Sequence, residues 1–202
     1  MERPQHVAAV VLAAGESRRF GSPKQLAQLD GRTLLEHVLE LARAAELDPV
    51  VAVVPVWLSR PASMDDERLR WVRNPHPERG MSHSLRLGFA ALPRDVEAAV
   101  ILLGDQPSVG LATIGRLLLA RGERPLIATR AEGRMAAPVL VDRSHFGVVE
   151  QPSGDIGLRE VLASHPEWVL AVDVERAPSD VDTPDDLARI GHMFDSEAGK
   201  RR

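Results

Sequence analysis

The stretch VAAVVLAAG, residues 7–15, decides the fold that we expect for this chain. Its apolar run from Val7 to Leu12 is short, rich in valine, and soon followed by Gly15. Such a run is typical of a strand that is covered on both faces of a sheet. In an open sheet of parallel strands, ligands bind at the carboxyl ends of the strands. The loop that follows Leu12 is therefore the first place where we expect a binding site.

Similar apolar runs alternate with amphipathic segments along the rest of the chain. The expected strands cover residues 7–12, 50–54, 98–103, 125–129, 138–141 and 168–174. The expected helices cover residues 82–92, 111–121, 155–164 and 183–193, and one more begins after the capping-box residue Thr33. This alternation predicts an α/β fold with a mostly parallel open sheet and helices on both faces, as in Rossmann-like proteins. Residues 1–194 are expected to form a single domain, and residues 195–202 a disordered tail.

The composition excludes several classes of function. The chain has 202 residues, no cysteine, and 25 Lys and Arg against 29 Asp and Glu, which gives a net charge of −4. Without cysteine there is no disulfide scaffold, no Cys-ligated metal and no thiol catalysis, and a cytoplasmic location is expected. Mild acidity and only 3% aromatic residues argue against a nucleic-acid partner. No stretch reaches the roughly 20 apolar residues of a membrane span, so no membrane partner is expected.

The loop ESRRFGSPK, residues 16–24, favours a bound phosphate. Small residues around Gly15 let backbone N–H groups approach a ligand, and successive N–H groups form an anion-binding nest. Arg19 and Lys24 add positive charge beside that nest. The alternative is a glycine-rich surface turn with solvated arginines, which we favour for Arg18. The spacing fits neither a P-loop nor the GxGxxG of dinucleotide-binding proteins.

Asp105 follows the apolar strand at 98–103, so its carboxylate is expected at the carboxyl end of that strand. Carboxylate oxygens suit Mg2+, which binds proteins through one or two carboxylates and otherwise through substrate phosphates. The alternative is a turn in which Asp105 bonds its own backbone before Pro107.

A second acidic segment, DTPDDL, covers residues 182–187. Thr183 serves there as a helix cap followed by proline, which leaves the carboxylate of Asp182 free for another partner. The other acidic residues of this region are expected to form a solvated helix start. They are Asp180, Asp185 and Asp186.

The sequence LAAGESRRFGSPK, residues 12–24, resembles the signature LAAGxSxRMGxxK of nucleotidyltransferases, with Phe20 where methionine is usual. These enzymes join an NTP to a phosphorylated acceptor and release pyrophosphate. Further resemblances follow in the order that is usual in the family: residues 74–85 to NPxWxxGMxxSL, 102–107 to LLGDQP, 154–157 to GDxG, and 182–187 to DTPEDL. The chain is most similar to the molybdenum cofactor cytidylyltransferases, which activate molybdopterin with CTP. The resemblance implies the fold of nucleotide-diphospho-sugar transferases.

The resemblance also implies roles for single residues. Those implied to bind the nucleotide are Leu12, Ala13, Ala14, Gly15 and Ser17 in the first loop, and Gly80, Ser82 and Ser84 near the base and ribose. Those implied for the chemistry are Arg19, Lys24 and Asp105 as catalytic residues, Asp105 and Asp182 as ligands of a Mg2+ cofactor, and Asp155 on the acceptor side. For Ser82, a helix cap preceded by glycine is a close alternative.

We therefore expect a Mg2+-dependent nucleotidyltransferase that transfers CMP from CTP to the phosphate of molybdopterin, with a molybdoenzyme as its client. Ala14 favours CTP, because guanylyltransferases of this group usually carry glycine there. One alternative is a transferase of the same fold that acts on a sugar, polyol or other small phosphate. Another is a non-catalytic maturation factor that binds the cofactor for a molybdoenzyme. The chain departs from many relatives at Ala137-Pro138, where His-Pro is frequent, and at Val54-Pro55, where glycine is common.

Overall fold

A single seven-stranded sheet forms the centre of the protein. A computed structural model describes residues 6–64, 66–175 and 178–200, with residues 195–200 described by their backbone alone. The strands lie in the order β5-β4-β1-β6-β8-β7-β9. Their bounds are Val7–Leu12 (β1), Val50–Pro55 (β4), Leu69–Asn74 (β5), Ala98–Leu103 (β6), Leu126–Ala131 (β7), Arg134–Asp142 (β8) and Val169–Asp173 (β9). Only β8 runs antiparallel to its neighbours β6 and β7, so the described sheet is mostly parallel.

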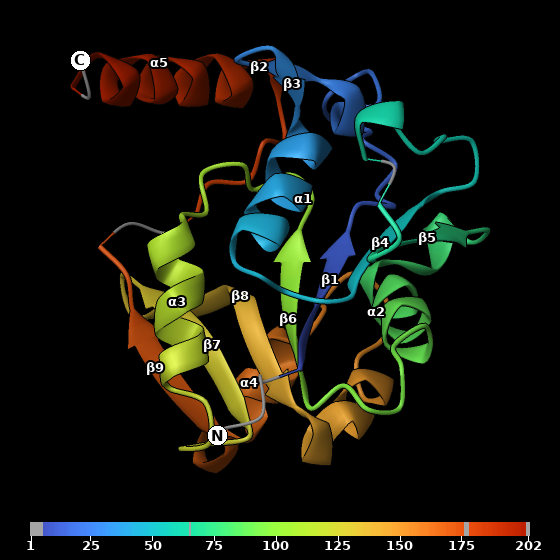
Figure 1. The fold of residues 1–202 in the computed structure, drawn as a ribbon, viewed down its shortest axis with the longest axis vertical. Helices are drawn as coiled ribbons and strands as arrows, with labels where there is room; N and C mark the ends of the chain where they lie inside the picture. The colour runs from blue at the N-terminus through green and yellow to red at the C-terminus, as the bar shows by residue number, and fades with distance from the viewer. Residues whose placement is uncertain (1–5, 65, 176–177, 201–202) are drawn as a thin grey trace.

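Helices cover both faces of this sheet. Helices α1 (Leu34–Ala44) and α3 (Leu111–Leu119) lie in front of it in Figure 1. Helices α2 (Met81–Ala90) and α4 (Arg159–Ser164) pack on the opposite face. The side chains of β1 alternate between the two cores, with Val11 in the first and Val10 in the second, and both are fully buried. Burial on both faces explains why β1 is an unbroken apolar run.

A smaller apolar cluster holds the last helix, α5 (Pro184–Lys200), against the main domain. Its buried members are Leu29, Leu34, Val181 and Ile190. Val181 lies in the segment that leads into α5, and Leu29 lies in a short hairpin of β2 (Gln28–Leu29) and β3 (Arg32–Thr33). The cluster therefore fixes the segment that carries Asp180 and Asp182.

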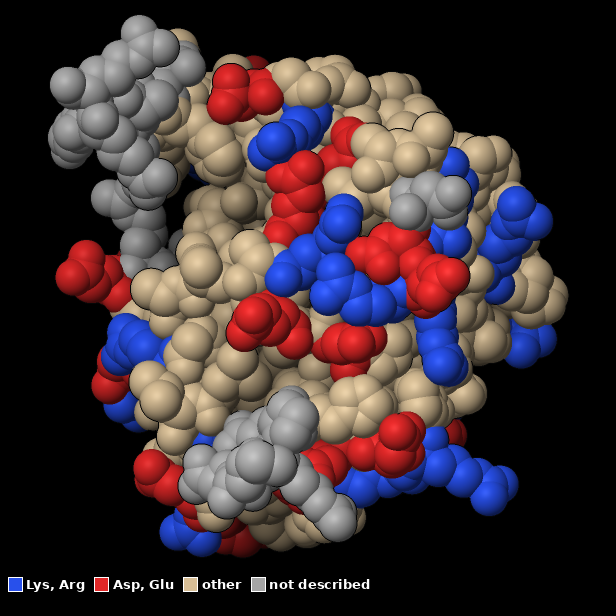
Figure 2. Space-filling view, in the orientation of Figure 1, with Lys and Arg blue, Asp and Glu red and all other residues tan. Residues whose placement is uncertain are grey.

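Short 3₁₀ helices complete the described chain. They are η1 (Lys24–Leu26), η2 (Ala62–Met64), η3 (Pro77–Arg79), η4 (Arg143–Glu150) and η5 (Pro166–Trp168). None of the helices in the described part of the chain has the length and apolar character needed to cross a membrane. On the face drawn in Figure 2, Lys and Arg side chains are interleaved with Asp and Glu.

The predicted α/β fold with a mostly parallel sheet and helices on both faces is confirmed. Strands β1 and β6 agree with the prediction residue by residue. Both hydrogen bonds of the predicted capping box between Thr33 and Glu36 are present. The sequence does not predict β5, because exposed Arg70 and Arg73 interrupt its apolar run.

Two helix bounds differ from the prediction by more than two residues. Helix α4 begins at Arg159 rather than at residue 155, because Gly154 and Gly157 have positive φ angles of 61° and 59° that a helix cannot contain. Helix α5 continues to Lys200, so the backbone of residues 195–200 is helical where the sequence predicts a disordered tail. The domain boundary at residue 194 stays a prediction.

Close packing of α2 on the sheet predicts a cost for any side chain at Gly88. A Cβ atom there would lie 2.4 Å from Cγ1 of Val10 and 3.2 Å from Cγ2 of Val53. We expect Gly88→Ala to lower the free energy of unfolding by about 1–3 kcal/mol, because the core must expand to admit the methyl group. Urea unfolding measures this.

The matched control is Gly115→Ala in α3, where a Cβ would meet nothing within 4 Å. Alanine is a better helix former than glycine, so this variant should gain up to about 1 kcal/mol. A Gly88→Ala protein as stable as Gly115→Ala would contradict the packing described for α2.

Candidate active site

The carboxyl ends of the central strands open into a cleft of about 580 Å³. The cleft contains most of the residues predicted from the sequence to form the site. Those that line it are Leu12, Ala13, Ala14, Gly15, Ser17, Arg19, Lys24, Gly80, Ser84, Asp105, Asp155 and Asp182. Ser82 does not line the cleft. Its side chain is fully buried, and its hydroxyl oxygen accepts a hydrogen bond from Arg86 at 3.4 Å.

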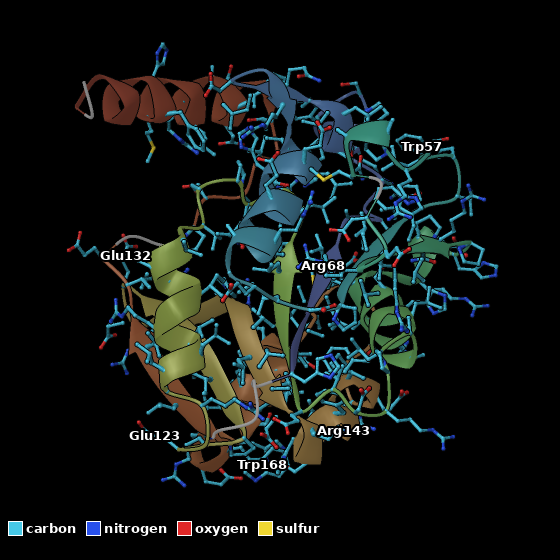
Figure 3. All side chains as sticks on the ribbon, viewed as in Figure 1. Trp57, Arg68, Glu123, Glu132, Arg143 and Trp168 are labelled. Atoms are coloured by element: carbon cyan, nitrogen blue, oxygen red, sulfur yellow. The ribbon has the colours of Figure 1, made fainter. Side chains whose placement is uncertain are left out.

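A second pocket, of about 330 Å³, adjoins the same loop. It shares residues 14–18 with the cleft and is also lined by Pro55, Trp57 and Pro77. In Figure 3, Trp57 lies toward the carboxyl ends of the central strands, whereas Arg143 and Trp168 lie at the opposite end of the molecule.

Gln25 organises the loop that follows β1. Its side chain is 3% exposed, and its Nε2 donates to the carbonyl oxygens of Ala13 at 2.9 Å and Gly15 at 2.7 Å. Its Oε1 accepts from the hydroxyl of Ser17 at 3.3 Å, and that hydroxyl oxygen accepts from the amide of Lys24 at 3.1 Å. Ser17 itself has a positive φ of 55°, which turns the chain at this point. The two ends of the loop are thus tied together by side chains inside it.

This fold of the loop leaves its amides available. Among the hydrogen bonds between described residues, none is donated by the backbone N–H groups of residues 14–19. Of their carbonyl oxygens, that of Gly15 accepts from Gln25, and that of Ser17 accepts from the amides of Phe20 and Gly21. A run of unpaired N–H groups beside a cleft is suited to bind the oxygens of an anion such as a phosphate.

Four charged side chains from three distant parts of the chain meet at the floor of the cleft. The Nζ of Lys24 lies 2.5 Å from Oδ2 of Asp105 and 3.1 Å from Oδ1 of Asp182. The Nη2 of Arg19 lies 2.8 Å from Oδ2 of Asp182. Arg18, in contrast, is largely exposed and pairs with Glu16, its neighbour in the loop. The structure therefore brings together the predicted catalytic residues, whereas Arg18 lines the cleft without joining their ion pairs.

Attraction between opposite charges holds the cluster of Arg19, Lys24, Asp105 and Asp182 together. Burial alone would lower the pKa of Lys24, but the charges and hydrogen bonds of Asp105 and Asp182 outweigh burial and raise it above 10.5. Lys24 is therefore fully charged at neutral pH. Asp180 lies in the same cleft, and its pKa is raised, first by withdrawal of its carboxyl group from water and then by the negative charge of Asp105.

Gln106 and Asp180 join the loop after β6 to the segment before α5. Gln106 is 4% exposed, and its Nε2 donates to Oδ1 of Asp180 at 2.7 Å. The amide of Val181 donates to the carbonyl oxygen of Asp105 at 3.0 Å. Asp180 thus lines the cleft, whereas the sequence predicts that it belongs to a solvated helix start. Asp186 also differs from that expectation, because its carboxylate completes a capping box with Thr183.

The residues at this floor fit a divalent cation. Oδ1 of Asp105 is buried and has no hydrogen-bond partner among the described residues, although a buried carboxylate oxygen normally has one. Among those same residues, no group of three or more His, Cys, Asp or Glu side chains is arranged to hold a metal ion by itself. Asp105 and Asp182 offer the one or two carboxylates that Mg2+ takes from a protein when phosphates supply its other ligands.

The start of α2 forms the opposite wall of the cleft. Gly80 has a φ of 79°, and a Cβ there would lie 2.4 Å from the carbonyl carbon of Gly154, so only glycine fits this contact. Oδ1 of Asp155 accepts from the amide of Met81 at 3.2 Å and so caps the helix from another loop. Asp155 therefore both supports this wall and lines the cleft.

Asn74 supports the same wall from behind. Its Oδ1 accepts from the amide of His76 at 2.8 Å, and its Nδ2 donates to the hydroxyl of Ser84 at 3.0 Å. Both Asn74 and Ser84 are buried. Ser84 is thus oriented by Asn74 at the inner edge of the cleft.

The sequence does not predict the roles that Gln25, Gln106 and Asp180 have in this site. Gln25 and Gln106 act through side-chain amides whose partners lie elsewhere in the fold, and glutamine carries no specific signal of that kind. Asp180 is one of four aspartates between residues 180 and 186, and only its tertiary partners, such as Gln106, set it apart. The one available signal was position, because Gln25 and Gln106 directly follow Lys24 and Asp105.

Comparison with known proteins identifies relatives of this chain. Residues 9–169 match the family described as the MobA-like NTP transferase domain. The chain is 32% identical over 198 residues to nicotine blue oxidoreductase of Paenarthrobacter nicotinovorans, covering 91% of this chain and 96% of that one. It is 28% identical over 201 residues to the purine catabolism protein PucB of Bacillus subtilis, covering 93% and 97%.

A solved structure shares the whole architecture. Rv0371c of Mycobacterium tuberculosis H37Rv is 30% identical and superimposes with a TM-score of 0.80, covering 93% of this chain and 98% of that one. The same protein has been solved in complex with manganese, and that structure is 27% identical in the aligned residues, with a TM-score of 0.75 and coverage of 93% and 98%.

The role of Gln25 in shaping the loop is testable. We expect Gln25→Ala to lower the free energy of unfolding by about 1–3 kcal/mol, because the carbonyl oxygens of Ala13 and Gly15 lose a buried donor. Its affinity for a nucleoside triphosphate should fall as well, because the amides of residues 14–19 are no longer held in one arrangement. Urea unfolding and calorimetric titration measure the two effects.

Gln28→Ala is the control for that variant, because Gln28 is exposed on β2. It should match the wild type in both measurements. An unchanged nucleotide affinity in Gln25→Ala would show that the loop does not depend on this side chain.

The raised pKa of Asp180 predicts that the stability of the protein depends on pH. A carboxyl group with a raised pKa stabilises the native state fully below its ordinary pKa of 3.8, and this contribution is lost as the pH rises through the raised value. Asp180→Asn should therefore raise the melting temperature at pH 7, and the gain should vanish as the pH falls below 3.8. Asp185→Asn, at the exposed start of α5, should show no such gain. A lower melting temperature for Asp180→Asn at pH 7 would contradict the crowding of charge described here.

Proposed function

This chain belongs to the MobA-like NTP transferase family, and on that premise we propose that it transfers CMP from CTP to the phosphate of molybdopterin. Membership of the family supports a transferase that uses a nucleotide. The observation that carries the proposal is the run of unpaired amides at residues 14–19, directly beside Lys24, Arg19 and two carboxylates. This combination suits a triphosphate and the charge that develops on it when pyrophosphate leaves.

The proposed binding mode follows the layout of the cleft. The amides of residues 14–17 and the guanidinium of Arg19 hold the β- and γ-phosphates, and Lys24 stabilises charge at the α-phosphate. The base and ribose lie against the wall built by Gly80 and Ser84. Ser82 is left out of this binding mode, because its side chain is buried behind the wall. Asp155 lies on the acceptor side.

Asp105 and Asp182 would hold Mg2+, which when bound would neutralise negative charge on the phosphates. The complex with manganese of the relative from Mycobacterium tuberculosis supports a divalent cation in this family. The unpartnered Oδ1 of Asp105 supports a cation at this carboxylate in the present chain.

The reaction needs positioning more than it needs acid–base groups. An oxygen of the acceptor phosphate attacks the α-phosphorus, the bond from that phosphorus to the β-phosphate breaks, and pyrophosphate leaves with the electron pair. A phosphate monoester has a second pKa of about 6, so the attacking oxygen is already largely ionised near neutral pH. The chain's own task is to align the two phosphates and to stabilise their charge, which Lys24, Arg19 and the loop amides do together.

The proposal that the substrates are CTP and molybdopterin rests on fewer residues than the proposal of a phosphate-binding site does. Ala14 supports CTP, because guanylyltransferases of this group usually carry glycine at that position. The overall likeness in sequence supports molybdopterin and a molybdoenzyme client. The alternative acceptor is a sugar, polyol or other small phosphate, because the phosphate-binding parts of the cleft would serve any of these.

A non-catalytic maturation factor is the alternative of another class. The ion pairs of Lys24 with Asp105 and Asp182 argue against it, because a carrier would not require a partly buried cation between two carboxylates. The name of the Paenarthrobacter relative describes an oxidoreductase. The amides and carboxylates of the cleft in this chain suit phosphates better than a redox reaction.

Asp105→Asn tests the catalytic centre. We expect kcat for pyrophosphate release to fall by about a hundredfold or more, because one charged oxygen ligand and the partner of Lys24 are lost together. Asp95→Asn is the control. Asp95 is exposed, pairs with His6, and precedes β6, whereas the cleft lies at the carboxyl end of that strand. An undiminished rate in Asp105→Asn would remove Asp105 from the mechanism.

The substrates are tested by comparing CTP, GTP, ATP and UTP in parallel, with Mg2+ and molybdenum cofactor. Pyrophosphate release with CTP alone, dependent on the cofactor, is the expected result. A preference for GTP would refute the role given to Ala14. Binding of Mg2+·CTP without release of pyrophosphate would refute molybdopterin as the acceptor and favour a sugar or polyol phosphate.

A further inference from the structure

The ammonium group of Lys24 lies between the two carboxylates that the proposed function assigns to a metal. It is within 2.5 Å of Asp105 and 3.1 Å of Asp182, on one oxygen of each. The three side chains are 15%, 19% and 28% exposed, so water screens them only in part. The pair of contacts is therefore much stronger than an ion pair on the open surface.

A divalent cation held by Asp105 and Asp182 would bind the same two carboxylates as this ammonium. Two carboxylates close enough to share one ammonium repel each other, and some cation must compensate that repulsion. Lys24 does so with one positive charge, and a divalent cation would do so with two. Both cannot remain between the carboxylates, because like charges at that separation repel strongly in a partly buried site.

Lys24 has an alternative partner within the same cleft. It lies on η1, directly after the phosphate-binding loop, and its flexible four-carbon side chain can swing while the backbone stays in place. The unpaired amides of residues 14–19 mark where a triphosphate would lie. An ammonium released from the two carboxylates would meet phosphate oxygens there.

We propose that Lys24 is a resident counter-ion that competes with the divalent cation for Asp105 and Asp182, so that the metal binds tightly only together with nucleotide phosphates that draw Lys24 away. This inference rests on the proposed function, because it takes Asp105 and Asp182 as the metal-binding carboxylates. It adds a second role for Lys24, which holds the site in order before the nucleotide arrives. It also gives a reason for ordered entry of the two ligands.

Arg19 contributes less to this competition. Among the described residues, its guanidinium forms an ion pair with Asp182 alone, and its side chain is 74% exposed. Substitution of Arg19 should therefore change metal affinity less than substitution of Lys24.

The test is binding of Mn2+ alone, followed by electron paramagnetic resonance, with no nucleotide present. We expect Lys24→Met to bind Mn2+ about tenfold more tightly than the wild type, because the competing charge is gone and the aliphatic packing is kept. Lys24→Gln should behave in the same way, which guards against misfolding of a single variant. Arg130→Met is the matched control: it removes the cation of the exposed ion pair with Asp173 and should leave Mn2+ affinity unchanged.

Equal or weaker Mn2+ binding in both Lys24 variants, with melting temperatures near that of the wild type, would overturn the inference. A similar gain in Arg130→Met would also overturn it, because the effect would then be one of overall charge. Failure of this inference differs from failure of the proposed function. In the first case the wild type still releases pyrophosphate; in the second it releases none with any nucleotide, whatever Lys24 does to Mn2+ affinity.

Discussion

The contact of Lys24 with Asp105 and Asp182 is the interaction on which the architecture of the cleft depends. It joins the loop after β1, the end of β6 and the segment before α5, which are far apart in the sequence. Around it, the amide of Val181 bonds to Asp105 and the side chain of Gln106 bonds to Asp180. The apolar cluster under α5 holds the last of these segments in place. A site for a highly charged ligand is thus built from opposite charges that already balance one another.

Polar side chains shape this site, whereas the apolar core only positions it. Gln25 uses its buried amide to fix the loop carbonyls, and the loop amides are consequently left free for a ligand. On the other wall, Asp155 caps α2 across a contact that only Gly80 permits. Buried networks of this kind specify one arrangement, because a partly satisfied network is costly.

The sequence predicts the fold well where one local pattern suffices. Unbroken apolar runs such as β1 identify the buried strands, and Thr33 with Glu36 identifies a helix start. The edge strand β5 alternates with charged residues and escapes this logic. The motifs predict that Lys24 and Asp105 share one site. The roles of Gln25 and Asp180 arise from tertiary contacts, which no local pattern contains.

The central claim is that the amides of residues 14–19 bind the phosphates of a nucleotide. A titration of ¹⁵N-labelled protein with Mg2+·CTP, followed by amide chemical shifts, tests it most directly. The account predicts that the largest shifts occur at residues 14–19 and at Lys24, with small shifts around Trp168 at the opposite end of the molecule. Saturating binding that leaves the amides of residues 14–19 unshifted would contradict it.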